Sequence, residues 1–274
     1  MRRPVRRPPR VVGTGLRYRP LPLHGANCAV GIVPGVREDG RGESGTVTPS
    51  AVLFDFHGTL VQVEDPVVWV REAAGACGRQ LDPIAATALA DRLVTAGRAG
   101  GPPPRRVPPH LAEVYADRDL DQRAHRAAYV GLAQTVPTDV AGLPEALYER
   151  LLLPQGWHNY QHTRATLAEL HARGIPVAVV SNIGFDIRPL VQALGFAGYV
   201  DAYVLSYELG RCKPDPAVFL SACAAIGADP ERTLMVGDTP ADAAAVAAGC
   251  RAYVLPSAPP GVDNGLSSVL ALLR

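Results

Sequence analysis

Carboxylate, hydroxyl, amide and ammonium side chains follow short apolar runs at four places in the sequence. They are Asp55 in DFHGTL, Ser181 and Asn182 in VVSNIGFD, Lys213 in GRCKPDP, and Asp238 and Asp242 in GDTPAD. A buried strand that delivers a carboxylate into a glycine turn is typical of catalytic groups in open α/β sheets. Two carboxylates placed beside a third require a cation to screen their charges. These residue types therefore indicate carboxylate chemistry that a cation assists.

Each of these residues also has an ordinary structural interpretation. A lone aspartate after a strand commonly caps the next helix, and Ser181 and Asn182 could cap the helix that begins near Phe185. Asp242 could merely favour a helix N-terminus. Lys213 is different, because 26 of the 27 basic residues are arginine and it is the one lysine. A compact ammonium group therefore stands where the planar fork of arginine would not substitute.

The elements that must position these residues alternate between strands and helices. The apolar runs predict strands at AVLF (51–54), PVAVVS (176–181), AYVLS (202–206), TLMVG (233–237) and AYVL (252–255). Helical spacing is found at 163–173, 186–195, 216–226 and 240–249. This alternation predicts a doubly wound parallel sheet of the α/β class. The carboxyl ends of its strands meet at one edge, so we expect the four polar groups to converge.

A long insert, residues 64–158, separates the first strand from the others and contains no strand-like run. Its apolar spacing predicts helices at 66–76, 83–96, 119–134 and 143–153. The Pro-rich segment 97–110 predicts a surface loop. We therefore expect a small helical lid on an α/β core formed by residues 49–63 and 159–274.

The composition excludes several classes of protein. With 274 residues, 47% of them hydrophobic and 19% charged, the chain can bury a globular core. No run of about 18 apolar residues is present, so we expect no membrane span. Five widely spaced cysteines without a CxxC pair favour neither a disulfide framework nor a zinc site, and the reducing cytoplasm is the expected compartment.

The first 48 residues differ in composition from the rest of the chain. They hold nine arginines against three acidic residues and are rich in proline and glycine, which predicts a disordered extension. Because the whole chain has a net charge of only +1, the body that follows is mildly acidic. This charge balance argues against nucleic acid as a partner of the body.

Taken together and in this order, the four motifs resemble those of the haloacid dehalogenase superfamily of hydrolases. The resemblance covers residues 51 to about 256, and the helical insert is similar to the type-one cap of that family. The family resemblance implies a Rossmann-like α/β core, an inserted helical cap, and an enzyme that works through a covalent intermediate on an aspartate.

The resemblance also implies roles for individual residues. Asp55 would be the nucleophile that attacks phosphorus and forms an aspartyl-phosphate. Mg²⁺ would be held by Asp55, the backbone carbonyl of His57 and Asp238, with Asp242 as a further ligand or as support. Lys213 would pair with Asp55 and with the phosphoryl charge.

Four further residues are implied to form the phosphate site: Gly58, Thr59, Ser181 and Asn182. Ser181 and the amide groups near Asn182 would hold phosphate oxygens. Gly58 and Thr59 would shape the turn that lets Asp55 face the ligand.

One position departs from the family pattern. Two residues after the nucleophile, phosphatases of this family usually carry a second aspartate that protonates the leaving group and later activates water, whereas this chain carries His57. Imidazole titrates near neutral pH, so His57 could act as acid and then as base. Alternatively, His57 shapes the pocket of a slow enzyme, or it marks a different class of substrate.

The leading hypothesis is a Mg²⁺-dependent phosphohydrolase for a small phosphorylated metabolite, because a lid that closes over the site favours small substrates. Hydrolysis of carbon–halogen bonds is an alternative within the same superfamily. Dehalogenases that resemble this chain replace the metal-binding aspartate of the fourth motif, and this sequence retains Asp238 and Asp242. The other alternative is a phospho-ligand sensor that lost efficient turnover when His57 replaced the usual aspartate.

Overall fold

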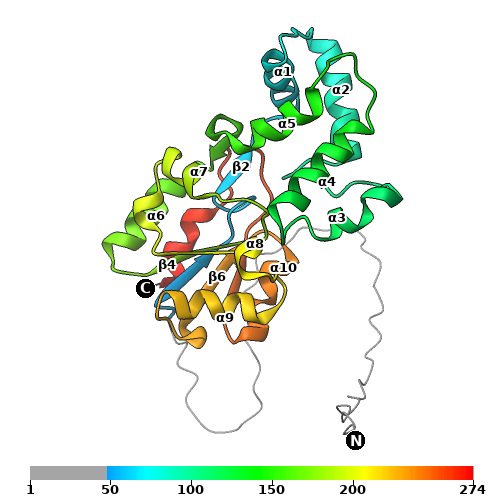
Figure 1. Ribbon diagram of the computed structural model, residues 1–274. Helices are drawn as coiled ribbons and strands as arrows, with labels where there is room; N and C mark the ends of the chain where they lie inside the picture. Colours follow the sequence, from blue (N-terminus) through cyan, green and yellow to red (C-terminus); the bar gives the residue numbers. More distant parts are fainter. Residues whose placement is uncertain (1–47, 274) are drawn as a thin grey trace, which may run out of the picture.

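Five short apolar runs form one parallel sheet in the computed structural model, which describes residues 48–273 (Figure 1). The strands are β1 (Ala51–Phe54), β4 (Val177–Ser181), β5 (Ala202–Leu205), β6 (Thr233–Gly237) and β7 (Arg251–Val254). Their order across the sheet is β5-β4-β1-β6-β7, and all neighbours are parallel. The extension predicted for residues 1–48 lies, apart from Thr48, outside the described residues.

Helices connect these strands and cover both faces of the sheet. They are α6 (Thr163–Ala172), α7 (Arg188–Ala193), α8 (Ser206–Leu209), α9 (Pro216–Ala225) and α10 (Pro240–Ala243), with 3₁₀ helices η3 (Ala197–Tyr199), η4 (Pro230–Arg232), η5 (Ala244–Ala248) and η6 (Leu266–Leu273). Phe54 packs in one apolar cluster with Leu170 of α6, and Leu53 packs in another with Phe219 of α9. Since β1 is buried on both faces, the predicted doubly wound α/β fold is confirmed.

In the C-terminal part of the core, two elements differ from the sequence-based expectation. The helix predicted at 240–249 is divided into α10 and the 3₁₀ helix η5, in an alanine-rich segment that ends at Gly249. The C-terminal helix η6 was not predicted, although Leu266, Val269 and Leu273 belong to the core cluster. These residues are three and four positions apart, which is the spacing of a helical face, so the sequence did carry a signal for this helix.

Residues between β1 and β4 also form a separate group of helices, drawn in cyan to green in Figure 1. They are α1 (Pro66–Ala76), α2 (Pro83–Ala96), α3 (Ala112–Ala116), α4 (Gln122–Gln134) and α5 (Leu143–Leu152), with η1 (Pro109–Leu111) and η2 (Pro154–Gly156). Asp65 and Asp82 cap α1 and α2, each followed by proline at the first helical position. Apolar residues of α1, α2, α4 and α5 share a core cluster of their own.

The expectation that segment 64–158 holds no strand is wrong at its end. Strand β3 (Trp157–Asn159) pairs antiparallel with β2 (Val61–Val63), and the two form the ribbon through which the chain enters and leaves the helical insert. Three residues are too few for alternation to be recognised in a sequence. Their pairing depends on bringing together two segments almost one hundred residues apart.

The turn before α4 makes a second contact between the insert and the core. The Ser206 hydroxyl accepts a hydrogen bond from the Ile183 amide at 2.8 Å and donates one to the carbonyl oxygen of Asp119. A Cβ atom at position 184 would overlap the carbonyl oxygen of Arg118, so Gly184 permits this approach. The insert therefore rests directly on the loop that follows β4.

His125 of α4 is buried at this contact, with 3% of its surface exposed. Its Nδ1 atom lies 2.8 Å from the Tyr148 hydroxyl, and its ring packs edge-on against Phe185 with centroids 5.3 Å apart. Burial, and secondarily the charge of Arg118, lower the pKa of His125 to about 3. The imidazole is therefore neutral in the folded protein at neutral pH.

We expect this histidine to make folding sensitive to acid. The unfolded chain protonates near pH 6.5 and the folded one only near pH 3, so the contribution of His125 is complete above pH 6.5 and is lost as pH falls toward 3. The free energy of unfolding should drop by about 1.4 kcal/mol for each pH unit in this range from this group. Denaturant unfolding between pH 7 and 4.5 measures it. His125→Asn should show a shallower decline, and equal slopes would contradict the assignment.

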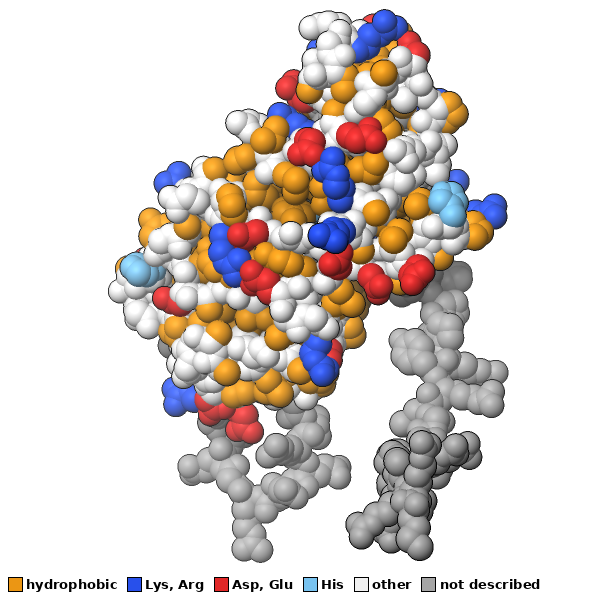
Figure 2. All heavy atoms as spheres, viewed as in Figure 1, with side chains coloured by type: hydrophobic (Ala, Val, Ile, Leu, Met, Phe, Trp, Pro, Cys, Tyr) orange, Lys and Arg blue, Asp and Glu red, His pale blue; other side chains and the backbone are white. Residues whose placement is uncertain are grey.

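On the face shown in Figure 2, acidic and basic side chains are interspersed rather than gathered by sign. Within residues 48–273, no helix is both long enough and apolar enough to cross a bilayer.

Candidate active site

Asp55 lies at the carboxyl end of the central strand β1, and a tight turn follows it. The Gly58 amide donates to the Val61 carbonyl at 2.8 Å, and Gly58 has a φ of 87°, in the left-handed region. A Cβ atom at this position would overlap the carboxylate of Asp238, which lies just after β6. Glycine therefore serves both the turn and the close approach of the two aspartates.

Lys213 is buried and contacts two of the carboxylates. Its Nζ atom donates to Asp55 Oδ1 at 2.6 Å, to Asp242 Oδ1 at 2.6 Å and to the carbonyl oxygen of Val180 at 2.9 Å. These contacts use all three donors of the ammonium group at a single nitrogen, which the spread donors of a guanidinium would not reproduce. Burial by itself would lower the pKa of Lys213, but the charges of Asp55 and Asp242 raise it above its usual value.

Asp55, Asp238 and Asp242 converge as expected from the parallel sheet. One carboxylate oxygen from each lies within 4.8 Å of the others. Asp242 is already engaged, because its second oxygen accepts hydrogen bonds from the Thr239 amide at 3.0 Å and the Thr239 hydroxyl at 2.6 Å. Asp238 accepts a long hydrogen bond from the Thr59 hydroxyl, at 3.3 Å.

The positive charge of Lys213 does not balance the negative charges of the three carboxylates in this cluster. Burial raises the pKa of Asp55; Lys213 counters this shift, and the charges of Asp242 and Asp238 add to it. Burial and the charge of Asp242 raise the pKa of Asp238 to about 6. Three carboxylates face one ammonium, so the cluster favours a further cation.

Mg²⁺ fits these residues better than a softer metal. The available donors are carboxylate oxygens, and hard divalent cations select oxygen ligands. Asp55 and Asp238 have the less occupied carboxylates, whereas Asp242 is held by Lys213 and Thr239. The fit therefore favours Asp242 as a support rather than a direct ligand.

Ser181 ends strand β4, and Asn182, which follows it, contacts Lys213. The Lys213 amide donates to Asn182 Oδ1 at 2.7 Å, and Asn182 Nδ2 donates to the Lys213 carbonyl oxygen at 2.9 Å. The Asn182 side chain thus fixes the backbone that carries the lysine. That Ser181 and the neighbouring amides hold phosphate remains a prediction.

His57 occupies the turn after Asp55, against the ribbon of β2 and β3 that joins the core to the insert (the hinge ribbon). Its Nε2 atom lies 2.5 Å from Gln62 Oε1, and its ring meets Trp157 edge-on with centroids 5.9 Å apart. Burial lowers the pKa of His57 to about 4; the Gln62 hydrogen bond opposes that shift and the charge of Arg98 adds to it. The imidazole is therefore neutral at pH 7.

Gln62, Tyr160 and Thr239 surround the predicted residues but were not predicted themselves. Thr239 had a signal, because a threonine three residues before an aspartate forms a capping box, and the structure contains one. Gln62 and Tyr160 had none: Gln62 contacts His57, and Tyr160, which directly follows β3, contacts Gln62.

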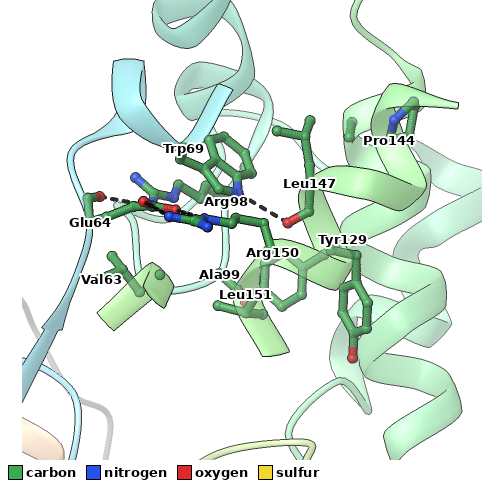
Figure 3. Close-up of a pocket in the computed structure, with 14 residues that line it drawn as sticks. Val63, Glu64, Trp69, Arg98, Ala99, Tyr129, Pro144, Leu147, Arg150 and Leu151 are labelled. Carbon is green, nitrogen blue, oxygen red and sulfur yellow. Dashed lines mark hydrogen bonds and ion pairs between the residues drawn. The ribbon is translucent and has the colours of Figure 1, made fainter. Parts of the chain in front are cut away.

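A small cavity of about 20 Å³, roughly the room of one water molecule, lies between the hinge and the helical insert (Figure 3). Beside it, Arg150 makes two hydrogen bonds of 2.7 Å to the buried carboxylate of Glu64. Arg98 stacks over Trp69 at 4.4 Å and donates to the Glu64 carbonyl oxygen at 2.9 Å. The carboxylate cluster is not part of this cavity, and these contacts attach the insert to the hinge.

Comparison with known proteins places this arrangement in a wider group. A family model described as haloacid dehalogenase-like hydrolase matches residues 49–249. A phosphoglycolate phosphatase of Yersinia pseudotuberculosis is 30% identical over 203 residues, which are 73% of this chain and 77% of that protein. A haloacid dehalogenase-like hydrolase domain-containing protein 3 of Bos taurus is 31% identical over 121 residues, 44% of this chain.

Other matches cover less of their proteins or show the fold alone. The chain spans 47% of the bovine protein and 33% of a phosphoserine phosphatase of Thermus thermophilus, so it matches half or less of these two relatives. A crystal structure of a dehalogenase has a TM-score of 0.57 and 22% identity, and the match covers 82% of this chain and 97% of that one.

Proposed function

Because the chain belongs to the haloacid dehalogenase-like hydrolases, we propose that it is a Mg²⁺-dependent phosphatase for a small phosphorylated metabolite. The observation that carries this proposal is the cluster in which buried Lys213 bridges Asp55 and Asp242 while Asp238 remains available. Relatives with phosphatase names, for phosphoglycolate and phosphoserine, support phosphate esters as the class of substrate.

In the proposed reaction, Asp55 attacks phosphorus through a carboxylate oxygen. A bond forms between that oxygen and phosphorus, the ester bond breaks, and its electron pair leaves with the alkoxide. Mg²⁺, held by Asp55, Asp238 and the backbone carbonyl of His57, would neutralise phosphoryl charge. Lys213 orients Asp55 and supplies a fixed positive charge beside the transferring group.

We propose that residues 64–158 act as the cap. Gly100 of the insert reaches the turn after β1, where a Cβ atom would lie 2.9 Å from His57 Nε2. The insert thus lies over the carboxyl edge of the sheet, where it can exclude water and confine the leaving group. This placement favours small substrates.

Carbon–halogen hydrolysis is the second candidate, since the dehalogenase structure shows the same fold. A metal-free attack on carbon gives no role to a third carboxylate. Burial and the charge of Asp242 raise the pKa of Asp238, so its charged form is unfavourable without a cation. The retained Asp238 therefore favours phosphate over halide.

Release of inorganic phosphate from a panel of phosphorylated metabolites, with Mg²⁺ and with EDTA, tests the proposal. Turnover that requires Mg²⁺ supports it. Absence of phosphate release by the folded, Mg²⁺-binding protein would reject it for that panel, and release of halide from haloacids would support the second candidate.

Asp238→Asn is expected to weaken Mg²⁺ binding. Loss of a direct ligand should raise the Mg²⁺ concentration for half-maximal activity by about a hundredfold. Loss of a residue that only hydrogen-bonds to a metal ligand already weakens binding by up to about that factor. A Mg²⁺ titration of phosphate release measures this, with the exposed Asp91→Asn as matched control. An unchanged midpoint would remove Asp238 from the metal site.

A further inference from the structure

The side chain of Gln62 connects His57 to the hinge ribbon through directed hydrogen bonds. We propose that Gln62 is a positioning residue that holds His57 as the Nε2–H tautomer, so that Nδ1 is the atom that takes a proton from the water that hydrolyses the aspartyl-phosphate. The assignment of the tautomer depends on the direction of hydrogen bonds alone. The kinetic consequence also rests on the proposed function.

The direction of each hydrogen bond follows from backbone groups that can only donate or only accept. The carbonyl oxygen of Ala258 only accepts, so the Tyr160 hydroxyl, 2.8 Å away, donates to it. The oxygen of Tyr160 is then free to accept from Gln62 Nε2 at 3.2 Å. The Val63 amide, which only donates, lies 3.0 Å from Gln62 Oε1. Both contacts orient the Gln62 amide with its oxygen toward His57.

An amide oxygen cannot donate, so the short contact of 2.5 Å to His57 Nε2 requires a hydrogen on that nitrogen. The proton on one ring nitrogen of a neutral histidine leaves a lone pair on the other. Gln62 therefore determines which nitrogen can act as a base, although it does not contact the carboxylates.

The two nitrogens also differ in their surroundings. Gln62 occupies the Nε2 side, and Gly100 of the insert approaches it. Nδ1 makes no hydrogen bond to any residue between 48 and 273, and it is not one of the fully buried polar atoms that lack a partner there. It is therefore the nitrogen that water can reach.

The proposed step balances without another reactant. A water oxygen attacks phosphorus, one water proton moves to His57 Nδ1, and the bond between phosphorus and the Asp55 oxygen breaks, with its electron pair returning to the carboxylate. The imidazolium then releases its Nδ1 proton to solvent, and the Nε2 proton stays with Gln62. The neutral ring carries no proton at Nδ1. His57 therefore does not protonate the leaving group in the first step.

The tautomer can be tested without any substrate. Long-range ¹H–¹⁵N correlation spectra of the full-length, ¹⁵N-labelled protein distinguish a protonated ring nitrogen from an unprotonated one, and the His57 signals are those lost in His57→Asn. We expect a protonated Nε2 and an unprotonated Nδ1 in the wild type, and a mixture of both tautomers in Gln62→Leu. A protonated Nδ1 in the wild type, or an unchanged pattern in Gln62→Leu, would overturn the proposal.

The kinetic consequence separates positioning from a merely structural role. Gln62→Leu should lower kcat by about a hundredfold, the lower end of what a positioned base contributes, with little change in kcat/KM. Acid-quenched samples should accumulate phosphorylated protein. Tyr160→Phe should lower kcat less than Gln62→Leu does. Gln192→Leu makes the same change on the exposed side of α7 and should leave kcat unchanged.

A parallel fall of kcat and kcat/KM in Gln62→Leu, without accumulated phosphoprotein, would contradict the role of Gln62 in the second step. If the wild type hydrolyses no phosphate ester, the proposed function fails, while the spectra still decide the tautomer. The two failures are thus distinguishable.

Discussion

Replacing Asp55 with asparagine is expected to reduce Mg²⁺-dependent phosphate release by at least about a thousandfold, because removal of a covalent nucleophile leaves only binding and charge stabilisation. The amide has nearly the same shape as the carboxylate, so it tests the nucleophile without emptying the space beside Lys213. Asp55 is 7% exposed, directly follows β1 and accepts a hydrogen bond from Lys213.

Two measurements complete this test. Denaturant unfolding should show that Asp55→Asn stays folded, because burial raises the pKa of Asp55 and a neutral side chain is tolerated there. Brief reaction with substrate followed by acid quench should label the wild type and leave the variant unlabelled. Phosphate release from Asp55→Asn at the wild-type rate would identify a contaminating phosphatase or a different nucleophile.

Lys213→Met is expected to reduce both the stability and the turnover of the protein. Methionine is of similar length but leaves the carboxylates of Asp55 and Asp242 buried without the ammonium group that now lies 2.6 Å from each. Removal of one partner from a buried ionic cluster costs about 3–5 kcal/mol of unfolding free energy. Loss of the fixed charge should lower kcat by about a hundredfold or more.

The pH dependence of this variant distinguishes charge from shape. Protonated carboxyl groups require no cation, so the stability deficit of Lys213→Met should shrink as pH falls and grow as it rises. Mg²⁺ should also stabilise Lys213→Met more than the wild type, since it supplies the missing positive charge. Arg211→Met, which removes an exposed cation from the same turn, is the matched control. Equal deficits for both variants at all pH values would contradict the assigned role of Lys213.

Much of the fold was predictable because its signals are local. Runs such as AVLF and TLMVG are apolar on both faces, as buried parallel strands must be, and the helices between them have regular apolar spacing. The start of α2 was readable from Asp82 followed by proline. The ribbon of β2 and β3 was not, because three-residue strands acquire their stability only from each other.

The sequence by itself determined the residue types of the candidate site and the edge of the sheet at which they meet. Asp55 and Asp238 directly follow strands, and Lys213 and Asp242 lie in the segments after β5 and β6. A parallel sheet brings the carboxyl ends of its strands together whatever their distance along the chain. The single lysine among 27 basic residues was a compositional signal of the same kind.

Only the tertiary structure decided how these groups share their hydrogen bonds. Asp242 is held by Lys213 and Thr239, the Asn182 side chain fixes the backbone of Lys213, and Gln62 orients His57. The contacts of Lys213 with Asp242 and with Asn182 join groups that are 29 and 31 residues apart in the sequence and less than 3 Å apart in space. Sequence spacing defines which edge of the sheet a residue reaches, but the direction of a hydrogen bond is set by the packing that surrounds both partners.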